Sequence, residues 1–204
     1  MTSLSARLRD QFGELDIHLF DQFLRCRIAE GMRLLDAGCG AGRKLVLPLR
    51  EGFDVQGIDE NAEAIAGVRR LAARLAPSLG PGRFRVERVD ELSLPDQSID
   101  VVISSAVLHF ARDDEHWRAM VHEMWRVLAP GGILFVRLAM SLGQPGLQPL
   151  GGRRHLMPDG SARYLVDAEC LLETTAELGG SLVDPIKCTI VHDLRSMGTW
   201  ILRK

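Results

Sequence analysis

The sequence predicts an α/β protein with a mostly parallel β-sheet that is covered by helices on both faces. Segments typical of strands alternate with segments typical of helices, which is the order that βαβ units produce. One strand is centred on Val101-Val-Ile103, a continuous apolar run of the kind that is buried on both faces of a parallel sheet. The first strand ends in a glycine-rich loop, Gly38-Cys-Gly-Ala-Gly42, which leads into a helix-length segment.

The individual elements follow from hydrophobic spacing and from glycine and proline breaks. Leucine and phenylalanine recur every three or four residues within 2–30, so residues 1–30 are expected to form a helical N-terminal cap. Strands are expected at 33–38, 54–59, 84–89, 99–104 and 132–138, with two more near 182–191 and 198–203. Helices are expected at 43–51, 61–76, 114–128 and 167–178. Pro48 removes a backbone donor from the first of these helices, which should therefore kink or start late.

One segment interrupts this alternation. Residues 141–164 contain many glycines and prolines, and we expect an irregular insertion there on the substrate side of the sheet. No internal repeat or linker divides the chain, so residues 1–204 are expected to form a single domain.

Composition excludes several classes of protein. With 204 residues, 46% of them hydrophobic and 25% charged, the chain is neither disordered nor a coiled coil. A net charge of -2 gives no basic excess for gripping phosphates, so nucleic acid is not an expected partner. The four cysteines have no metal-site spacing, and no metal is expected. The N-terminus is charged and has no apolar signal segment, and no apolar run could span a bilayer, so we expect a cytoplasmic protein with no membrane partner.

The glycine loop departs from two common nucleotide motifs. A dinucleotide fingerprint needs a third glycine where Arg43 stands, and a P-loop needs a lysine followed by serine or threonine, whereas Lys44 is followed by Leu45. Asp36 precedes the glycines, which is unfavourable for a pyrophosphate and favourable for a ligand that carries positive charge. The loop therefore indicates a binding site at the carboxyl ends of the strands.

Two further aspartates close the next two expected strands. Asp59 ends the second strand, where a carboxylate can accept both hydroxyls of a ribose. Asp90 ends the third, where it could accept a hydrogen bond from an adenine amino group. Together with Asp36, these residues put three carboxylates at one edge of the sheet.

These motifs resemble the class I S-adenosylmethionine (SAM)-dependent methyltransferases. The resemblance covers about residues 32–140 and rests on four segments: Leu34-Leu-Asp-Ala-Gly-Cys-Gly-Ala-Gly-Arg43, Gly57-Ile-Asp-Glu-Asn61, Leu94-Pro-Asp-Gln-Ser-Ile-Asp-Val-Val102 and Val127-Leu-Ala-Pro-Gly-Gly-Ile-Leu134. It implies a Rossmann-like sheet of seven strands with the last strand antiparallel. It also implies SAM as cofactor and S-adenosylhomocysteine (SAH) as product.

The resemblance implies a set of cofactor contacts. Asp36, Gly38, Cys39 and Gly40 would line the methionine part, with Ser104 and Ser105 beneath it. Asp59 would bind the ribose, although Glu60 follows it directly and is the alternative. Asp90 with the backbone of Glu91 and Leu92 would hold the adenine.

Residues for the acceptor are less constrained, because methyl transfer depends mainly on alignment and exclusion of water. His109 follows the fourth strand and is the catalytic candidate; a general base is needed only if the acceptor must lose a proton. The residues expected to contact the acceptor are His18, Arg153, Arg154, Tyr164 and Arg195.

The resulting hypothesis is an enzyme of class EC 2.1.1 that methylates a small molecule by in-line displacement and acts as a monomer or homodimer. A methyltransferase for RNA or protein, and a SAM-binding protein without catalysis, are the alternatives. A nicotinamide-dependent oxidoreductase is a third, disfavoured by the missing glycine. The sequence does not identify the acceptor or the atom that is methylated.

Overall fold

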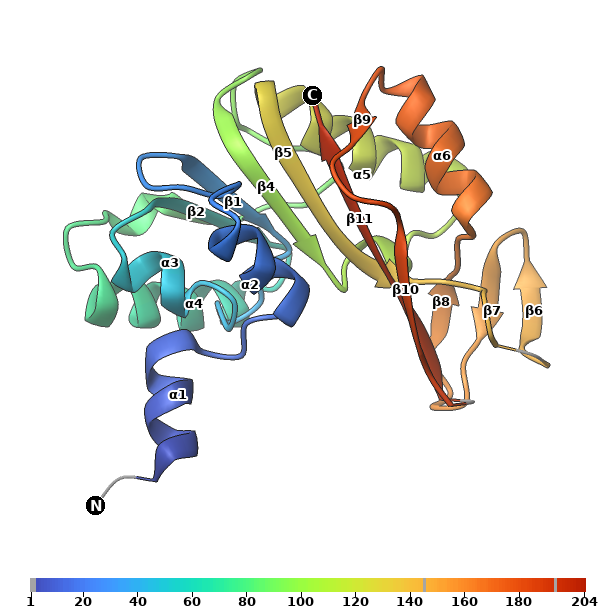
Figure 1. Cartoon of the computed structure of the whole chain (residues 1–204), viewed down its shortest axis with the longest axis horizontal. Helices are drawn as coiled ribbons and strands as arrows, with labels where there is room; N and C mark the ends of the chain where they lie inside the picture. Colours follow the sequence, from blue (N-terminus) through green and yellow to red (C-terminus); the bar gives the residue numbers. More distant parts are fainter. Residues whose placement is uncertain (1–2, 145, 193) are drawn as a thin grey trace.

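The main sheet has the strand order β10-β11-β5-β4-β1-β2-β3, and β9 pairs with β11 beside it. A computed structural model describes residues 3–144, 146–192 and 194–204 of the chain (Figure 1). Neighbouring strands from β1 to β5 run parallel, and β11 is antiparallel to β5. The strands are β1 (Arg33–Ala37), β2 (Asp54–Asp59), β3 (Phe84–Val86), β4 (Ile99–Ser105), β5 (Leu128–Ala139), β9 (Ser181–Leu182), β10 (Lys187–Val191) and β11 (Arg195–Arg203). The expected fold class is confirmed, with the two-residue strand β9 added.

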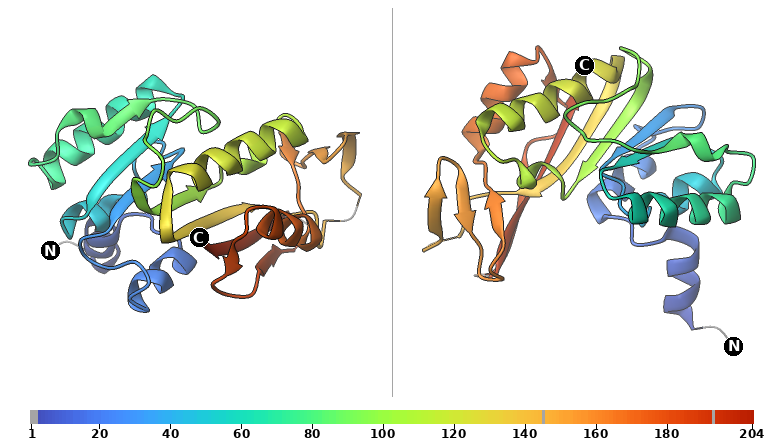
Figure 2. Two further views of the ribbon diagram at one scale, coloured as in Figure 1. Left: turned by 90° about the horizontal axis from the view of Figure 1, so that it is seen from above. Right: turned by 180° about the vertical axis from the view of Figure 1, so that it is seen from behind.

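Helices cover both faces of this sheet (Figure 2). The helices are α1 (Leu4–Phe12), α2 (Ile17–Leu24), α3 (Val46–Arg50), α4 (Ala62–Leu75), α5 (Asp114–Val127) and α6 (Ala168–Glu177). On one face, Leu19 of α2, Leu49 of α3 and Val68 of α4 share a core with the sheet. On the other, Met124 of α5 and Leu171 of α6 do the same. Within the described part of the chain, no helix is both long and apolar enough to cross a membrane.

The N-terminal segment, expected to be a helical cap, contains two separate helices, α1 and α2. Gly13 separates them with φ +68°, and a Cβ there would lie 2.5 Å from the carbonyl oxygen of Arg43. Such close packing in a left-handed conformation requires glycine. Helix α1 has no buried residue and projects from the body of the molecule (Figure 1).

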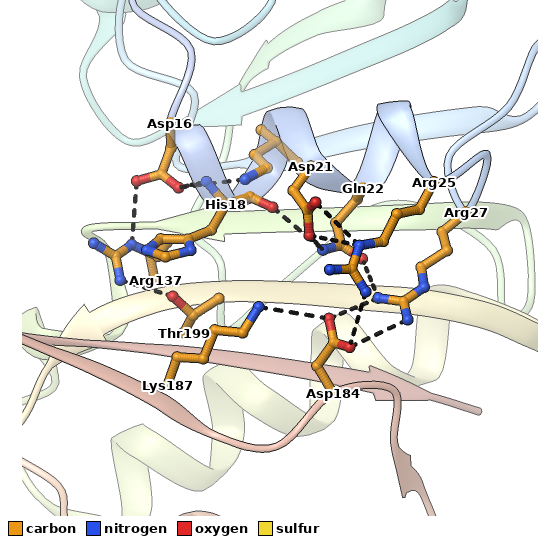
Figure 3. Close-up of polar contacts among 11 residues, drawn as sticks. Asp16, His18, Asp21, Gln22, Arg25, Arg27, Arg137, Asp184, Lys187 and Thr199 are labelled. Carbon is orange, nitrogen blue, oxygen red and sulfur yellow. Dashed lines mark hydrogen bonds and ion pairs between the residues drawn. The ribbon is translucent and has the colours of Figure 1, made fainter.

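Helix α2 is tied to the sheet by charged side chains (Figure 3). Asp16 caps the helix through Oδ1, which accepts the His18 N–H at 2.8 Å. Its Oδ2 accepts from Arg137 Nε of β5 at 3.2 Å, and Arg137 also donates to Thr199 Oγ1 of β11 at 2.7 Å. The contact between Asp16 and Arg137 joins segments 121 residues apart in the sequence.

Two boundaries near the candidate site, at the start of α3 and the end of β3, have local causes. Helix α3 starts late, at Val46, as expected; Pro48 then stands in the first turn, where its missing N–H has no partner to lose. Strand β3 ends at Val86, opposite Asp59, because β2 ends there and offers no further partner. Asp90 therefore lies in the following loop and not at the end of the strand.

The glycine and proline content of residues 141–164 predicts an irregular insertion, and this prediction is wrong. The segment contains a three-stranded antiparallel sheet of β6 (Gln148–Gly151), β7 (Arg154–Leu156) and β8 (Ala162–Tyr164). Its glycines stand mostly at turns, such as Gly160 with φ +79° between β7 and β8. Tyr164 fastens this sheet to α5: its ring stacks on Trp117 at 5.5 Å, and its hydroxyl donates to Asp114 at 2.9 Å.

We expect Tyr164→Phe to lower the free energy of unfolding by about 1 kcal/mol, because it removes one hydrogen bond to a solvated carboxylate and keeps the ring stack. Tyr164→Ala should cost about 3 kcal/mol or more through the lost ring. Urea titration of the two variants measures both effects. Equal losses in the two variants would show that the hydroxyl, and not the stack, holds the small sheet.

Candidate functional site

A cavity of about 630 Å³ lies at the carboxyl ends of β1, β2 and β4. This is where the strand order reverses between β4 and β1, the usual ligand site of an open α/β sheet. The volume suits a small ligand or cofactor. Seven of the residues expected from the sequence are in its wall: Gly38, Cys39, Gly40, Asp59, Glu60, Asp90 and Ser105.

The glycine loop is held against β2 and leaves open space above it. The backbone N–H groups of Gly38 and Cys39 both donate to the Ile58 carbonyl, at 2.9 and 2.8 Å. A Cβ on Gly38 would meet Val107 at 2.4 Å, so the loop packs tightly on the segment after β4. At Gly40, with φ +52°, no atom beyond its two chain neighbours lies within 4 Å of the Cβ position. A ligand can therefore approach the backbone at Gly40.

Asp59 has a carboxylate that the protein orients on both sides. Its Oδ2 accepts the Gly40 N–H at 2.8 Å, and its Oδ1 accepts the Asn61 N–H at 2.9 Å. Each oxygen retains a lone pair that can accept from a ligand. Glu60 also lines the cavity but is exposed. The structure thus gives Asp59, and not Glu60, a fixed orientation at the wall.

Of the three residues expected at the adenine, only Asp90 lines this cavity. Arg88 forms a two-point ion pair with its carboxylate. The backbone N–H of Glu91 donates to the Arg88 carbonyl at 3.3 Å, and that of Leu92 donates to Glu123 at 2.9 Å. Both amides that the resemblance assigns to adenine thus have partners inside the protein, and their contact with adenine stays a prediction.

Asp36 and Ser104 lie behind the cavity wall. Both are fully buried, and neither the two carboxylate oxygens of Asp36 nor Ser104 Oγ has a hydrogen-bond partner. Burial raises the pKa of Asp36 to about 6, Lys44 opposes the shift and Asp59 adds to it. A buried acid without a donor calls for an explanation, and a cationic ligand nearby supplies one.

His109 does not line the cavity, although Val107 and Phe110 on either side of it do. The side chain is buried, and Nδ1 has no hydrogen-bond partner. Burial, with a smaller contribution from Arg163, lowers the pKa of His109 to about 4. An imidazole with so low a pKa is a weak base at neutral pH. The structure therefore places His109 in a buried position next to the wall, and its catalytic role stays a prediction.

None of the five residues expected to contact the acceptor is in the cavity wall: His18, Arg153, Arg154, Tyr164 and Arg195. Tyr164 is buried and donates its hydroxyl to Asp114, so its contact with the acceptor stays a prediction. Arg153 pairs with Asp167, the N-cap residue of α6, at 3.1 Å. His18 lies on α2, Arg154 on β7 and Arg195 at the start of β11.

Sequence reasoning missed part of the wall. Arg88, Arg112, His116 and Met120 line the cavity together with Phe110. The spacing of Met120 predicts a core position, and it is indeed buried, but the first turns of α5 also face the ligand site. One sequence signal could have revealed these wall residues: a charged or imidazole side chain at the start of a helix that follows the end of a strand.

Comparison with known proteins agrees with this geometry. Residues 35–136, half of the chain, match the model of a family described as a methyltransferase domain. A ubiquinone biosynthesis O-methyltransferase of Brucella anthropi is 29% identical over 165 residues, which cover 78% of this chain and 64% of that protein. The chain thus spans less than two thirds of the length of that relative.

Solved structures share the fold. A SAM-dependent methyltransferase of Methanosarcina mazei superposes with a TM-score of 0.74 at 23% identity, covering 89% of this chain and 96% of that one. The Burkholderia thailandensis 1,6-didemethyltoxoflavin-N1-methyltransferase, solved with its substrate and SAH bound, superposes with a TM-score of 0.69 at 20% identity, covering 89% and 75%. On the family match, with the sheet and the glycine loop in agreement, the chain belongs to the methyltransferase-domain family.

Proposed function

We propose that this chain is a SAM-dependent methyltransferase that moves a methyl group to a small-molecule acceptor. The observation that carries the proposal is the pair formed by the open space at Gly40 and the fixed carboxylate of Asp59 beside it. A backbone without side chains next to an oriented acceptor suits a nucleoside whose ribose hydroxyls need acceptors. Family membership supports the same reading.

The residues of the site fit SAM in their chemistry. Asp59 would accept hydrogen bonds from the ribose hydroxyls, and Asp90 would accept one from the amino group of the adenine. Asp36, buried and unpartnered, would balance the positive charge of the methionine part. When bound, SAM supplies a methyl group on a sulfonium that leaves as a neutral thioether. The protein's contribution is to align the acceptor and exclude water, which needs no general base unless the acceptor must lose a proton.

The small sheet β6–β8 is proposed to border the acceptor. This is supported by Arg163 of β8, whose guanidinium lies 4.5 Å above the ring of Phe110, a residue of the cavity wall. The relative from Brucella anthropi is named as an O-methyltransferase and the Burkholderia thailandensis neighbour as an N1-methyltransferase. Both names indicate small-molecule acceptors, and this is the substrate class that we propose. Because one name specifies oxygen and the other nitrogen, the proposal does not specify the atom that receives the methyl group.

We expect SAM and SAH, but not NAD, to raise the melting temperature of the purified chain. A ligand at 100 times its dissociation constant adds roughly 2.7 kcal/mol to the stability of the native state. Differential scanning fluorimetry with the three ligands measures this, and SAH production with a panel of phenols, catechols and heterocyclic amines then tests turnover. A shift with NAD and none with SAM or SAH would contradict the proposal.

A further inference from the structure

His116, at the start of α5, faces the carboxylate proposed to read the adenine. Its imidazole Nε2 lies 3.4 Å from Asp90 Oδ2, and both residues line the cavity. We infer that His116 is a positioning residue that orients Asp90 so that the carboxylate discriminates a 6-amino purine from a 6-oxo purine. The inference rests on the proposed function, because it assigns a role within the same cofactor site.

The surroundings of the ring determine which nitrogen carries the proton. The backbone N–H of Arg112 donates to His116 Nδ1 at 3.1 Å, so Nδ1 must present a lone pair. In the neutral ring the proton is then on Nε2, the atom nearest Asp90. The His116 backbone is also fixed, because its N–H donates to the Asp113 carboxylate at 2.8 Å at the helix N-cap. The imidazole is therefore held at Nδ1 and at its backbone, with Nε2 3.4 Å from Asp90 Oδ2.

Among the side chains whose nitrogens approach Asp90, that of His116 is the most shielded. Arg88 and Arg112 also approach the carboxylate, but their side chains are 47% and 60% exposed. The side chains of His116 and Asp90 are each 14% exposed. Exposed ion pairs are weakened by solvent and by side-chain motion. The contact with His116 therefore adds a shielded constraint on the carboxylate beside the bidentate pair with Arg88.

The partners of Asp90 are divided unequally between its two oxygens. Arg88 contacts both, through Nε at Oδ1 and Nη2 at Oδ2. His116 adds a second partner at Oδ2 only. A carboxylate oxygen accepts about two hydrogen bonds, so Oδ1 keeps a lone pair for a ligand donor. A 6-amino group can use that lone pair, whereas a 6-oxo group would place an acceptor against it.

Two variants separate this role from support of the loop. His116→Asn keeps an acceptor near the position of Nδ1 for the Arg112 N–H but removes the donor to Asp90. His116→Gln keeps a donor near the position of Nε2 but removes the acceptor for Arg112. The dissociation constants of SAH and of S-inosyl-L-homocysteine, which carries oxygen in place of the amino group, are measured for each by titration calorimetry, together with melting temperatures.

The wild-type protein is expected to prefer SAH at least roughly tenfold, as sites built around a substrate donor do. His116→Asn should reduce this preference several-fold at an unchanged melting temperature. His116→Gln should retain the preference and melt lower. His122→Asn is the matched control, because His122 lies on the same helix, contacts Glu177 at 2.9 Å and is not in the cavity wall; it should leave the preference unchanged.

The outcomes distinguish the two claims. If the wild-type protein binds neither thioether, the proposed function fails and this inference fails with it. If the wild-type protein prefers SAH and His116→Asn prefers it equally, only the inference is overturned. Loss of preference in both variants together with lower melting temperatures would also overturn it, because the ring would then act only through the fold of the loop.

Discussion

Asp59→Ala is expected to weaken SAH binding by about two orders of magnitude or more. The carboxylate would accept two ribose hydroxyls, and a hydrogen bond to a charged acceptor contributes roughly 1.5–3 kcal/mol, where about 1.4 kcal/mol is tenfold in affinity. The same carboxylate holds the Gly40 and Asn61 N–H groups, so its removal also releases the loop. Titration calorimetry with SAH measures the change in dissociation constant.

Two companion variants make this result specific. Glu60→Gln should change affinity less than about threefold, because Glu60 is exposed and solvent screens its charge. Asp90→Ala should cost about tenfold, since the expected contact is a single hydrogen bond. Wild-type binding by Asp59→Ala together with weak binding by Glu60→Gln would transfer the ribose contact to Glu60.

Asp36→Asn is expected to stabilise the ligand-free protein at pH 8 by about 3 kcal/mol while weakening the binding of SAM. Burial raises the pKa of Asp36 from 3.8 to about 6 in the folded state, against the opposing charge of Lys44. The fold thus favours the protonated acid. Its contribution to stability is fully present below pH 3.8 and is lost as the pH rises through 6, at about 1.4 kcal/mol per pKa unit.

Asparagine carries no charge, so it avoids this penalty at every pH. In urea titrations between pH 5 and 8, the difference between variant and wild type should therefore grow with pH and level off above about pH 7. SAM should lose more affinity than SAH, because only SAM has the sulfonium charge. A difference in stability that is independent of pH would show that the ionised Asp36 is already satisfied within the fold.

The N-terminal half of the site could be predicted from the sequence because its signals are local. Gly38, Gly40 and Asp59 stand at strand ends that hydrophobic runs mark without any knowledge of distant contacts. The parallel sheet follows in the same way from strands that alternate with helices, and so does the late start of α3, at Val46, which Pro48 predicts. In each case the residue that matters and the pattern that reveals it lie within a few positions of one another.

The sequence by itself therefore determined the fold class, the glycine loop and the acid beside it. Only the tertiary structure decided the contacts that join distant segments. The Tyr164 hydroxyl donates to Asp114, which lies 50 positions earlier in the sequence. The Leu92 N–H donates to Glu123, which lies 31 positions later. The pairing of His116 with Asp90 and the order of the small sheet β6–β8 belong to the same class. A hydrophobic pattern specifies which face of an element is buried. The hydrogen-bond partner of a polar side chain depends instead on which donors and acceptors the packed elements bring within hydrogen-bond distance.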